Sequence, residues 1–320
     1  MVGYTIRRFL ALIPLLFAVV TLPFSLVPPV QGAPFDSDRP LTETPRARLE
    51  EKYNLDGSLG EQYVYYLRNL GRGDLGISFS NDRPVRDIIA DRFPVSLHLG
   101  LYAFVFALSM GLVLGVVAAL HQNGRWDYAT VFISTVGAAL PPFILAPFLV
   151  WGFALKLDWF NVLSSDYGPI SVLDWSWVWH DLTHMRQIVL PTVALGFLPA
   201  AFIARVTRAS MLDVLRQDYI RTARSKGLDH FRVVMRHAIR NALIPVLTIA
   251  GPIFAGLITG SFIIERAFSI PGLGRSFIES VVNRDYGVIM GTTVFFAVII
   301  SVMNLVVDLA YAIVDPRIRL

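Results

Sequence analysis

The sequence contains no cysteine, few charged residues and almost no lysine. Without cysteine the chain has no disulfide framework, no thiolate nucleophile and no Cys-ligated zinc or iron–sulfur site. Charged residues make up 16% of its 320 positions, against about 25% in ordinary soluble domains, whereas 54% are hydrophobic and the mean hydropathy is +0.56. The 12% aromatic residues and the long apolar runs exclude a disordered chain. These proportions favour a protein whose solvent is the lipid bilayer.

Three lysines stand beside 25 arginines, and their neighbours exclude one way of binding ATP. A Walker A loop needs Gly-Lys followed by Ser or Thr. Here the lysines follow Glu, Leu and Ser, at Lys52, Lys156 and Lys226. His180 and His184 have the four-residue spacing of a zinc pair, but Asp181 stands where a zinc protease has Glu, and no third ligand is evident. We therefore expect no catalytic residue, no metal site and no cofactor on this chain.

Six apolar stretches reach the roughly 17 to 25 residues that a helix needs to cross a bilayer. The first follows Arg7 and Arg8, and we interpret it as a retained helix, because its apolar run is too long for a signal peptide and no A-x-A site follows. An even number of spans places both termini on one side. The predicted spans are 9–30, 95–120, 129–155, 188–204, 243–264 and 288–314.

The loop charges orient these spans, since Lys and Arg accumulate on the cytoplasmic side. The 205–240 loop carries nine basic and three acidic residues, whereas 31–94 carries nine basic and eleven acidic ones. Both termini, the 121–128 loop and the 205–240 loop are therefore assigned to the cytoplasm. This topology also accounts for the basic pI of about 9.4, so that no nucleic-acid partner is expected.

The outer segment 31–94 is long enough for a small subdomain between the first two spans. Thr44 and Pro45 form a helix start, Ser58 to Glu61 forms a capping box, and the run 61–70 ends at Gly71. The segment Pro84 to Phe93 is amphipathic, so it either lies on the outer leaflet or packs within the subdomain; its apolar face carries Val85, Ile88 and Ile89. The predicted divisions are 1–30, 31–94 and 95–320.

Small residues and prolines mark the predicted spans. Small residues at four-residue spacing let helices approach closely in lipid, and they stand at Ala107, Gly111, Gly115 and Ala119 and at Gly256 and Gly260. Prolines break the helical hydrogen-bond ladder, which is tolerated at membrane depth where the freed carbonyls face protein or water. They stand at Pro141, Pro142, Pro147, Pro191, Pro199, Pro245 and Pro252. Kinked and closely packed helices of this kind favour a transport pathway.

Asp308 lies inside the last predicted span, where an acid indicates a function by default. It shares a helix face with Asn304. These two residues either line the pathway, or Asp308 pairs with an inward-facing arginine such as Arg205 and holds helices together. His98 is the other ionisable residue in the spans and lies on a different helix, so the paired groups of an intramembrane enzyme are lacking.

The stretch Asp218 to Pro245 is the most informative part of the cytoplasmic side. It predicts a helix over 219–226, a break at Gly227 and a second helix that starts at Asp229 and runs into the fifth span. Apolar residues alternate with arginines, at Ile220, Ala223, Leu228, Phe231, Val234 and Met235. Such a pattern is typical of a helix that docks in a partner's groove.

At this stretch the sequence resembles the membrane subunits of ATP-binding-cassette (ABC) importers, whose cytoplasmic signature is E-A-A, three residues and Gly. Positions 221–223 and Gly227 stand at the signature positions. The details look like the dipeptide/oligopeptide/nickel branch, which reads R-x-A-x-x-K-G and then R-H-A-x-R-N-A-x-x-P. That pattern is filled by Arg221, Ala223, Lys226, Gly227, Arg236, His237, Ala238, Arg240, Asn241, Ala242 and Pro245.

Further matches extend the resemblance over nearly the whole chain and are similar to the first, B-type, of that branch's two permeases. They are YTIRRFL (4–10), GRGDLGISF (71–79), RPV (83–85), ERAFSIPGLGRSF (265–277), RDY (284–286) and NLVVDLAYAIVDPRIRL (304–320). One departure is VPPVQGAP (27–34), where relatives often have a Pro-Gly-Asp-Pro turn.

The resemblance implies an all-α membrane protein with six transmembrane helices and type I ABC importer permease architecture. It also implies a heterodimer with a second homologous permease, two cytoplasmic ABC ATPases that bind ATP and Mg, an extracytoplasmic substrate-binding protein, and the inner membrane of a bacterium or archaeon. Within the cytoplasmic loop 205–242, the ATPase-coupling residues would be Tyr219, Arg221, Ala223, Lys226, Gly227 and Leu228. The outer gate loop would be Pro271, Gly272, Leu273 and Gly274.

The function implied by the resemblance is inward transport of dipeptides or oligopeptides, with no catalysis by this chain. A nickel or oligosaccharide importer of the same branch is the nearest alternative. An ion-coupled secondary transporter is a third, although it would usually need more charged groups at the midplane than His98 and Asp308 provide.

Overall fold

The computed structural model describes residues 14–25, 58–160, 182–259 and 262–314. Within these ranges the chain is helical apart from turns and an isolated antiparallel bridge between Ile77 and Pro84, which confirms the all-α prediction. The α- and π-helices are Pro14–Ser25, α3 (Leu59–Leu70), α4 (Val85–Leu120), α5 (Arg125–Ala139), α6 (Pro142–Leu149), η1 (Val150–Lys156), α8 (Leu182–Leu215), α9 (Asp218–Ser225), α10 (His230–Arg232), η2 (Val233–Ala238), α11 (Ile239–Ile258), α12 (Phe262–Ala267), α13 (Leu273–Val282) and α14 (Tyr286–Val314).

Four of the described helical stretches are long and apolar enough to cross a membrane: Val85–Leu120, Arg186–Leu215, His230–Ile258 and Tyr286–Val307. A fifth span arises if α5 and the α6–η1 pair are counted together. The first predicted span, 9–30, is described only over Pro14–Ser25. The described helices are therefore compatible with six spans.

The second predicted span is longer than the sequence suggested. Its helix α4 has 36 residues and runs through Pro94, so the amphipathic segment Pro84 to Phe93 is its first part rather than a separate helix. The apolar face of this segment is buried against Leu273 and Val288 of α13 and α14. The segment therefore packs inside the protein, but mostly against α13 and α14 rather than within the 31–94 subdomain, as had been expected.

The third predicted span, 129–155, is broken into two arms. The α5 axis and the axis of α6–η1 differ by 108°. Leu140 leaves the helical region with φ −91° and ψ 108°, as expected for a residue before proline, and Pro141 and Pro142 then cap and start α6. The consecutive prolines, which were expected to break the helical hydrogen-bond ladder, therefore turn the chain sharply within one apolar run.

Small residues bring α4 and α8 into close contact. A Cβ at Gly111 would lie 2.7 Å from the Ile203 Cβ, and one at Gly115 would lie 2.5 Å from the Thr207 Cβ. The predicted stripe on α4 is thus a helix-packing surface. Gly256, on α11, has no neighbour within 4 Å of its ideal Cβ, so no described part of this chain packs tightly there, and Gly260 lies outside the described residues.

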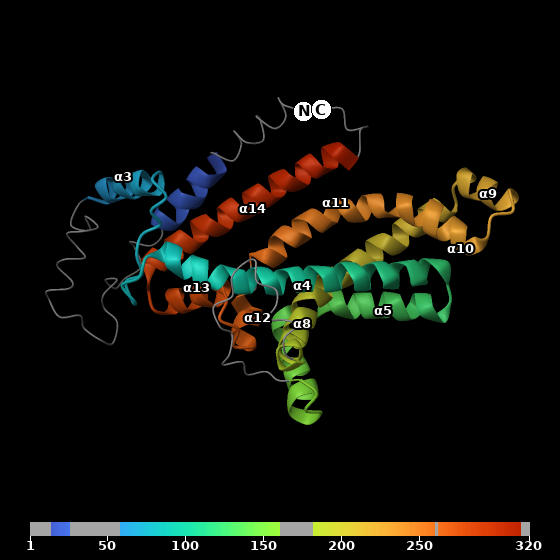
Figure 1. The fold of residues 1–320 in the computed structure, drawn as a ribbon, viewed down its shortest axis with the longest axis horizontal. Coiled ribbons are helices and arrows are strands. Elements are labelled where there is room, and N and C mark those ends of the chain that lie inside the picture. The colour runs from blue at the N-terminus through green and yellow to red at the C-terminus, as the bar shows by residue number, and fades with distance from the viewer. Residues whose placement is uncertain (1–13, 26–57, 161–181, 260–261, 315–320) are drawn as a thin grey trace.

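The long axis of the molecule separates two groups of loops (Figure 1). The turn from α4 to α5 lies at one end beside α9 and α10, whereas α3 and α13 lie toward the other end. The loops that charge assigned to one side of the membrane, 121–128 and 205–240, therefore meet at the same end of the bundle.

Candidate coupling and gate sites

Helix α9 ends at Ser225, and the residues Lys226, Gly227 and Leu228 close it in a Schellman motif. The amide of Leu228 donates to the carbonyl of Ala223 at 3.4 Å, and the amide of Gly227 donates to the carbonyl of Arg224 at 2.9 Å. Gly227 has a φ of +77°, in the left-handed region that favours glycine. Asp229 then caps the next helix with its side chain. The predicted break at Gly227 and the helix start after Asp229 are confirmed.

One face of α9 is packed against the protein's own helices. Ile220 is fully buried and Ala223 is 7% exposed, and both belong to a buried cluster that also holds Met211 of α8 and residues of η2, the element that α9 packs against. The rest of this buried cluster comes from α4, η2 and α11, at Ala119, Val233, Val234, Ala238 and Ala242. Ala223 therefore fixes the position of α9, and the prediction that all six alternating apolar residues face a partner is wrong for Ile220, Ala223 and Val234.

Large apolar side chains on α9, α10 and η2 are exposed. Phe231 is 71% exposed, Met235 51% and Tyr219 42%. The Tyr219 hydroxyl accepts a hydrogen bond of 2.8 Å from the side-chain amide of Asn241, which ties α9 to α11. We define Tyr219, Phe231 and Met235 as the exposed apolar face of the coupling loop.

Charged side chains surround this face. Arg221 and Lys226 are exposed, and Leu228 between the two helices is half-buried. The guanidinium of Arg221 lies 3.8 Å from the carboxylate of Asp218, and both side chains are largely in solvent. Such exposed pairs stabilise a helix little, so Arg221 is available to a partner.

The segment predicted as the outer gate loop is held by a buried polar cluster. The Ser96 hydroxyl on α4 donates to the carboxylate of Glu265 on α12 at 2.8 Å and accepts from the backbone amide of Leu273 at 2.8 Å. The second Glu265 oxygen accepts from the backbone amide of Arg275 at 2.9 Å. Three helices, α4, α12 and α13, are thereby joined around one carboxylate, which we call the Glu265 cluster.

Glycine is required where the gate loop passes this carboxylate. A Cβ at Gly272 would collide with the Glu265 carboxylate, and one at Gly274 would lie 3.0 Å from the Phe262 backbone. Gly272, Leu273 and Gly274 are buried, and Pro271 is half-buried. These residues therefore set the position of α12 and α13 instead of forming an open surface.

Glu265 lies between the spans α11 and α14 and is fully buried. Burial raises its pKa from the ordinary 4.5 to about 7, against the opposite effect of the hydrogen bonds from Arg275, Ser96 and Gly274 and of the nearby Arg92 charge. The sequence analysis missed Glu265, because it stands one residue beyond the predicted end of the fifth span.

A second buried carboxylate joins two of the motifs quoted above. Asp285 of RDY is 3% exposed and accepts hydrogen bonds from the Ser78 hydroxyl, from the amide of Phe79 at 3.0 Å and from the amide of Ser80 at 3.2 Å. It also caps α14, accepting from the amide of Val288 at 3.3 Å. The outer loop 71–84 is therefore attached to the start of the last helix.

The residues proposed for the pathway are only partly described. Asn304 is exposed on α14 and Ser301, three residues earlier, is 3% exposed. The side chain of Asp308 lies outside the described residues, and Arg205 is exposed. Neither alternative for Asp308 is therefore tested. Thr44, Pro45 and His180 also lie outside the described ranges, and within those ranges no group of three potential metal ligands occurs.

Comparison with known proteins matches the chain over its full length. Residues 111–320 match the family described as "Binding-protein-dependent transport system inner membrane component". The chain is 45% identical to the dipeptide transport system permease protein DppB of Bacillus subtilis (strain 168), covering 100% of this chain and 99% of that protein. It is 41% identical to the oligopeptide transport system permease protein OppB of Haemophilus influenzae and 39% identical to DppB of Lactococcus lactis subsp. cremoris, in both cases over 100% of each chain.

Proposed function

The chain belongs to the family of binding-protein-dependent transport system inner membrane components, and on that premise we propose that it forms, with a second permease, the path by which dipeptides or oligopeptides enter the cell. It is a transport subunit and not an enzyme. The names of the relatives, which are dipeptide and oligopeptide permeases, support a peptide substrate.

The observation that carries the proposal is the two-sided construction of α9. Its inner face, with Ile220, lies in a buried cluster shared with η2 and with Met211 of α8, while Tyr219 on α9 and Phe231 on the following α10 are exposed. A helix built in this way can be pushed by a partner and pass the displacement to the membrane helices, provided that the partner contacts it differently in its two states. Two cytoplasmic ATPases that bind ATP and Mg fit that role.

We further propose roles for the other sites and a location for the termini. Tyr219, Arg221, Lys226 and Leu228 contact an ATPase, while Ala223 and Gly227 hold the loop in shape. The Glu265 cluster keeps the outer gate loop in place beside an extracytoplasmic binding protein. Both termini lie in the cytoplasm of a bacterium or archaeon. Asn304 and Asp308 line the pathway or pair helices.

The test is reconstitution. The chain, its second permease and their ATPases are placed in proteoliposomes with the cognate binding protein, and uptake of labelled dipeptides, longer peptides, Ni²⁺ and oligosaccharides is compared with and without ATP. ATP-dependent uptake of a peptide is expected. If only Ni²⁺ or only an oligosaccharide is taken up, that solute and not a peptide is the substrate. Uptake driven by an ion gradient without ATPases would overturn the proposal.

A further inference from the structure

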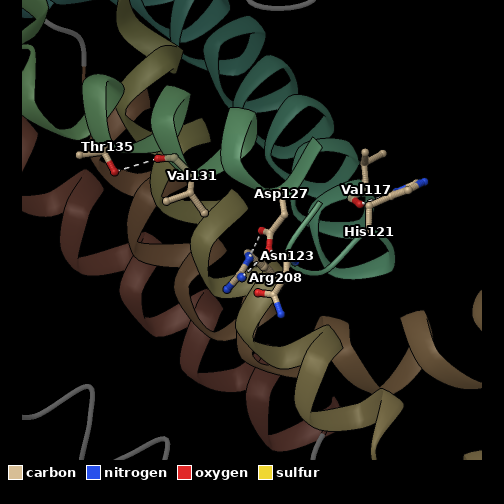
Figure 2. A network of polar contacts seen from close by, with 7 residues as sticks. All are labelled: Val117, His121, Asn123, Asp127, Val131, Thr135 and Arg208. Carbon is tan, nitrogen blue, oxygen red and sulfur yellow. Dashed lines mark hydrogen bonds and ion pairs between the residues drawn. The ribbon is translucent and has the colours of Figure 1, made fainter. Parts of the chain in front are cut away.

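Asp127, at the start of α5, and Arg208, near the end of α8, form a bidentate ion pair that the sequence analysis did not anticipate (Figure 2). The Arg208 Nη2 donates to one Asp127 oxygen at 2.8 Å while Nε donates to the other. Asp127 is 2% exposed. Bidentate pairing of this kind fixes the relative orientation of two side chains as well as joining them.

Asp127 is also bound to the turn that precedes α5. One of its oxygens accepts a hydrogen bond of 2.9 Å from the backbone amide of Asn123, which has a φ of +62°. The carboxylate therefore joins the α4–α5 turn, the first turn of α5 and α8 at a single point. Figure 2 shows Asp127 and Asn123 on one side of this point and Arg208 reaching it from the neighbouring helix.

Arg208 stands one helical turn before Met211. Met211 is fully buried in the same cluster as Ile220 and Ala223. On the same stretch of α8, Thr207 is 1% exposed and packs closely on Gly115 of α4. A displacement of α9 would therefore reach the segment of α8 that carries Arg208 through this shared cluster, in which η2 lies against both α9 and α8.

The route continues from Asp127 along α5 to the break at Leu140 and Pro141, where the span turns by 108°. Much of the outward surface of α5 carries exposed apolar side chains, at Trp126, Tyr128, Val131, Phe132 and Ile133. Inside the chain, α5 therefore depends on its contacts with α4 and α8 for its position. Among the contacts of α5 with α4 and α8 in the described part of the chain, the Asp127–Arg208 ion pair is the one between charged side chains.

We propose that the Asp127–Arg208 pair is a positioning pair that makes α5 follow α8 when α9 is displaced, so that ATP-driven motion reaches the bend in the third span. This inference rests on the proposed function, because it needs ATPases that act on α9. It assigns a transmission role to two residues outside the coupling loop and outside the gate.

The test measures substrate imported per ATP hydrolysed by the full complex in proteoliposomes. Asp127→Asn keeps the size of the side chain but removes the charge, and Arg208→Lys keeps the charge but not the two-pronged geometry. In both variants import per ATP should fall by about threefold or more, with ATPase activity and the thermal midpoint of the complex retained. The matched control is Asp158→Asn, which changes an exposed carboxylate at the far end of the same broken span and should leave the ratio unchanged.

The absence of cysteine provides a rescue experiment. In a complex with cysteine-free partners, Asp127→Cys with Arg208→Cys should lose coupling, and a short bifunctional methanethiosulfonate bridge should restore it until a reductant removes the bridge. A role in folding alone would not respond to a bridge added after assembly. If Asp127→Asn does not assemble, Arg208→Lys and the bridged pair carry the test.

An unchanged import-to-ATP ratio in an assembled variant, or a bridge without effect, overturns the inference. Failure of the wild-type complex to import peptide would instead contradict the proposed function.

Discussion

The hydroxyl of Ser78 donates to the carboxylate of Asp285, 207 positions further along the chain. This bond joins the outer loop that follows α3 to the first turn of α14. Gly287 lies against the same loop, since a Cβ there would collide with the carbonyl of Ile77. The last helix is therefore anchored at its first turn by a segment that precedes the second span.

Replacing Asp285 with Ala should release this anchor. The Ser78 hydroxyl and the amides of Phe79 and Ser80 would lose their acceptor, and leaving such groups unpaired costs about 1–3 kcal/mol. We expect a lower thermal midpoint of the purified complex, measured by intrinsic fluorescence in detergent. Asp82→Asn is the control, because Asp82 is exposed and asparagine tolerates its φ of +51°. An unchanged midpoint in Asp285→Ala would show that the anchor is not needed.

Glu265 should make the protein sensitive to pH. Its pKa is raised in the folded protein to about 7 from an ordinary 4.5, so the folded state binds more protons between these values. The stability it contributes is therefore complete below about pH 4.5 and is lost as the pH rises through 7. Glu265→Gln, which stays neutral, should flatten the decline of the thermal midpoint between about pH 5.5 and 8.

Glu279→Gln serves as the comparison for this experiment. Glu279 is an exposed residue of α13 paired with Arg275 at 2.6 Å, and its replacement should leave the pH profile as in the wild type. The prediction for Glu265 would be refuted by equal pH profiles of wild type and Glu265→Gln.

Gly227→Leu should uncouple ATP hydrolysis from uptake while the chain stays inserted. No atom lies within 4 Å of an ideal Cβ at this position, so the expected effect comes from the φ of +77°, which costs a side-chain-bearing residue about 1–2 kcal/mol. Gly227→Asn, which adopts this conformation more readily, should retain most of the uptake. Both are measured as uptake per ATP at matched abundance, and normal uptake by Gly227→Leu would defeat the assignment of the coupling loop.

Phe231→Ala and Ile220→Ala should affect different properties, the first the binding of the ATPases and the second the stability of the chain. Phe231 is 71% exposed, so its truncation should weaken recovery of the ATPases with the solubilised chain but leave the chain's own thermal midpoint unchanged. Ile220 is fully buried, and its truncation should destabilise the chain by about 2–5 kcal/mol. If the Phe231→Ala chain still recovers the ATPases normally, Phe231 is not part of the interface with them.

The sequence predicted the features whose cause is local. The capping box at Ser58 and Glu61 forms, because both partners stand within one helical turn. The break at Gly227 forms because glycine adopts positive φ easily. The burial of Ile88 and Ile89 also followed from helical periodicity.

The features that escaped prediction depend on distant partners or on local geometry that hydropathy averages away. Glu265 meets Ser96 across 169 positions and Arg208 meets Asp127 across 81, and no pattern within one segment reveals such pairs. The prolines of the third span predicted a break in its helix, but not the size of the bend after Leu140, because an apolar run gives one hydropathy peak whether or not its helix is continuous. Too many apolar residues of the coupling loop were predicted to face a partner, because the period of an amphipathic helix does not say whether its apolar side meets a partner or the chain's own helices.

At the bend between α5 and α6, two backbone carbonyl oxygens lack the N–H donor that a continuous α-helix would give them. The helical donors for the carbonyls of Gly137 and Ala138 would be the residues four positions ahead, and those are Pro141 and Pro142, which have no N–H. Acyl chains offer nothing to such oxygens. We therefore expect the bend of the third span to face another polypeptide or water rather than acyl chains.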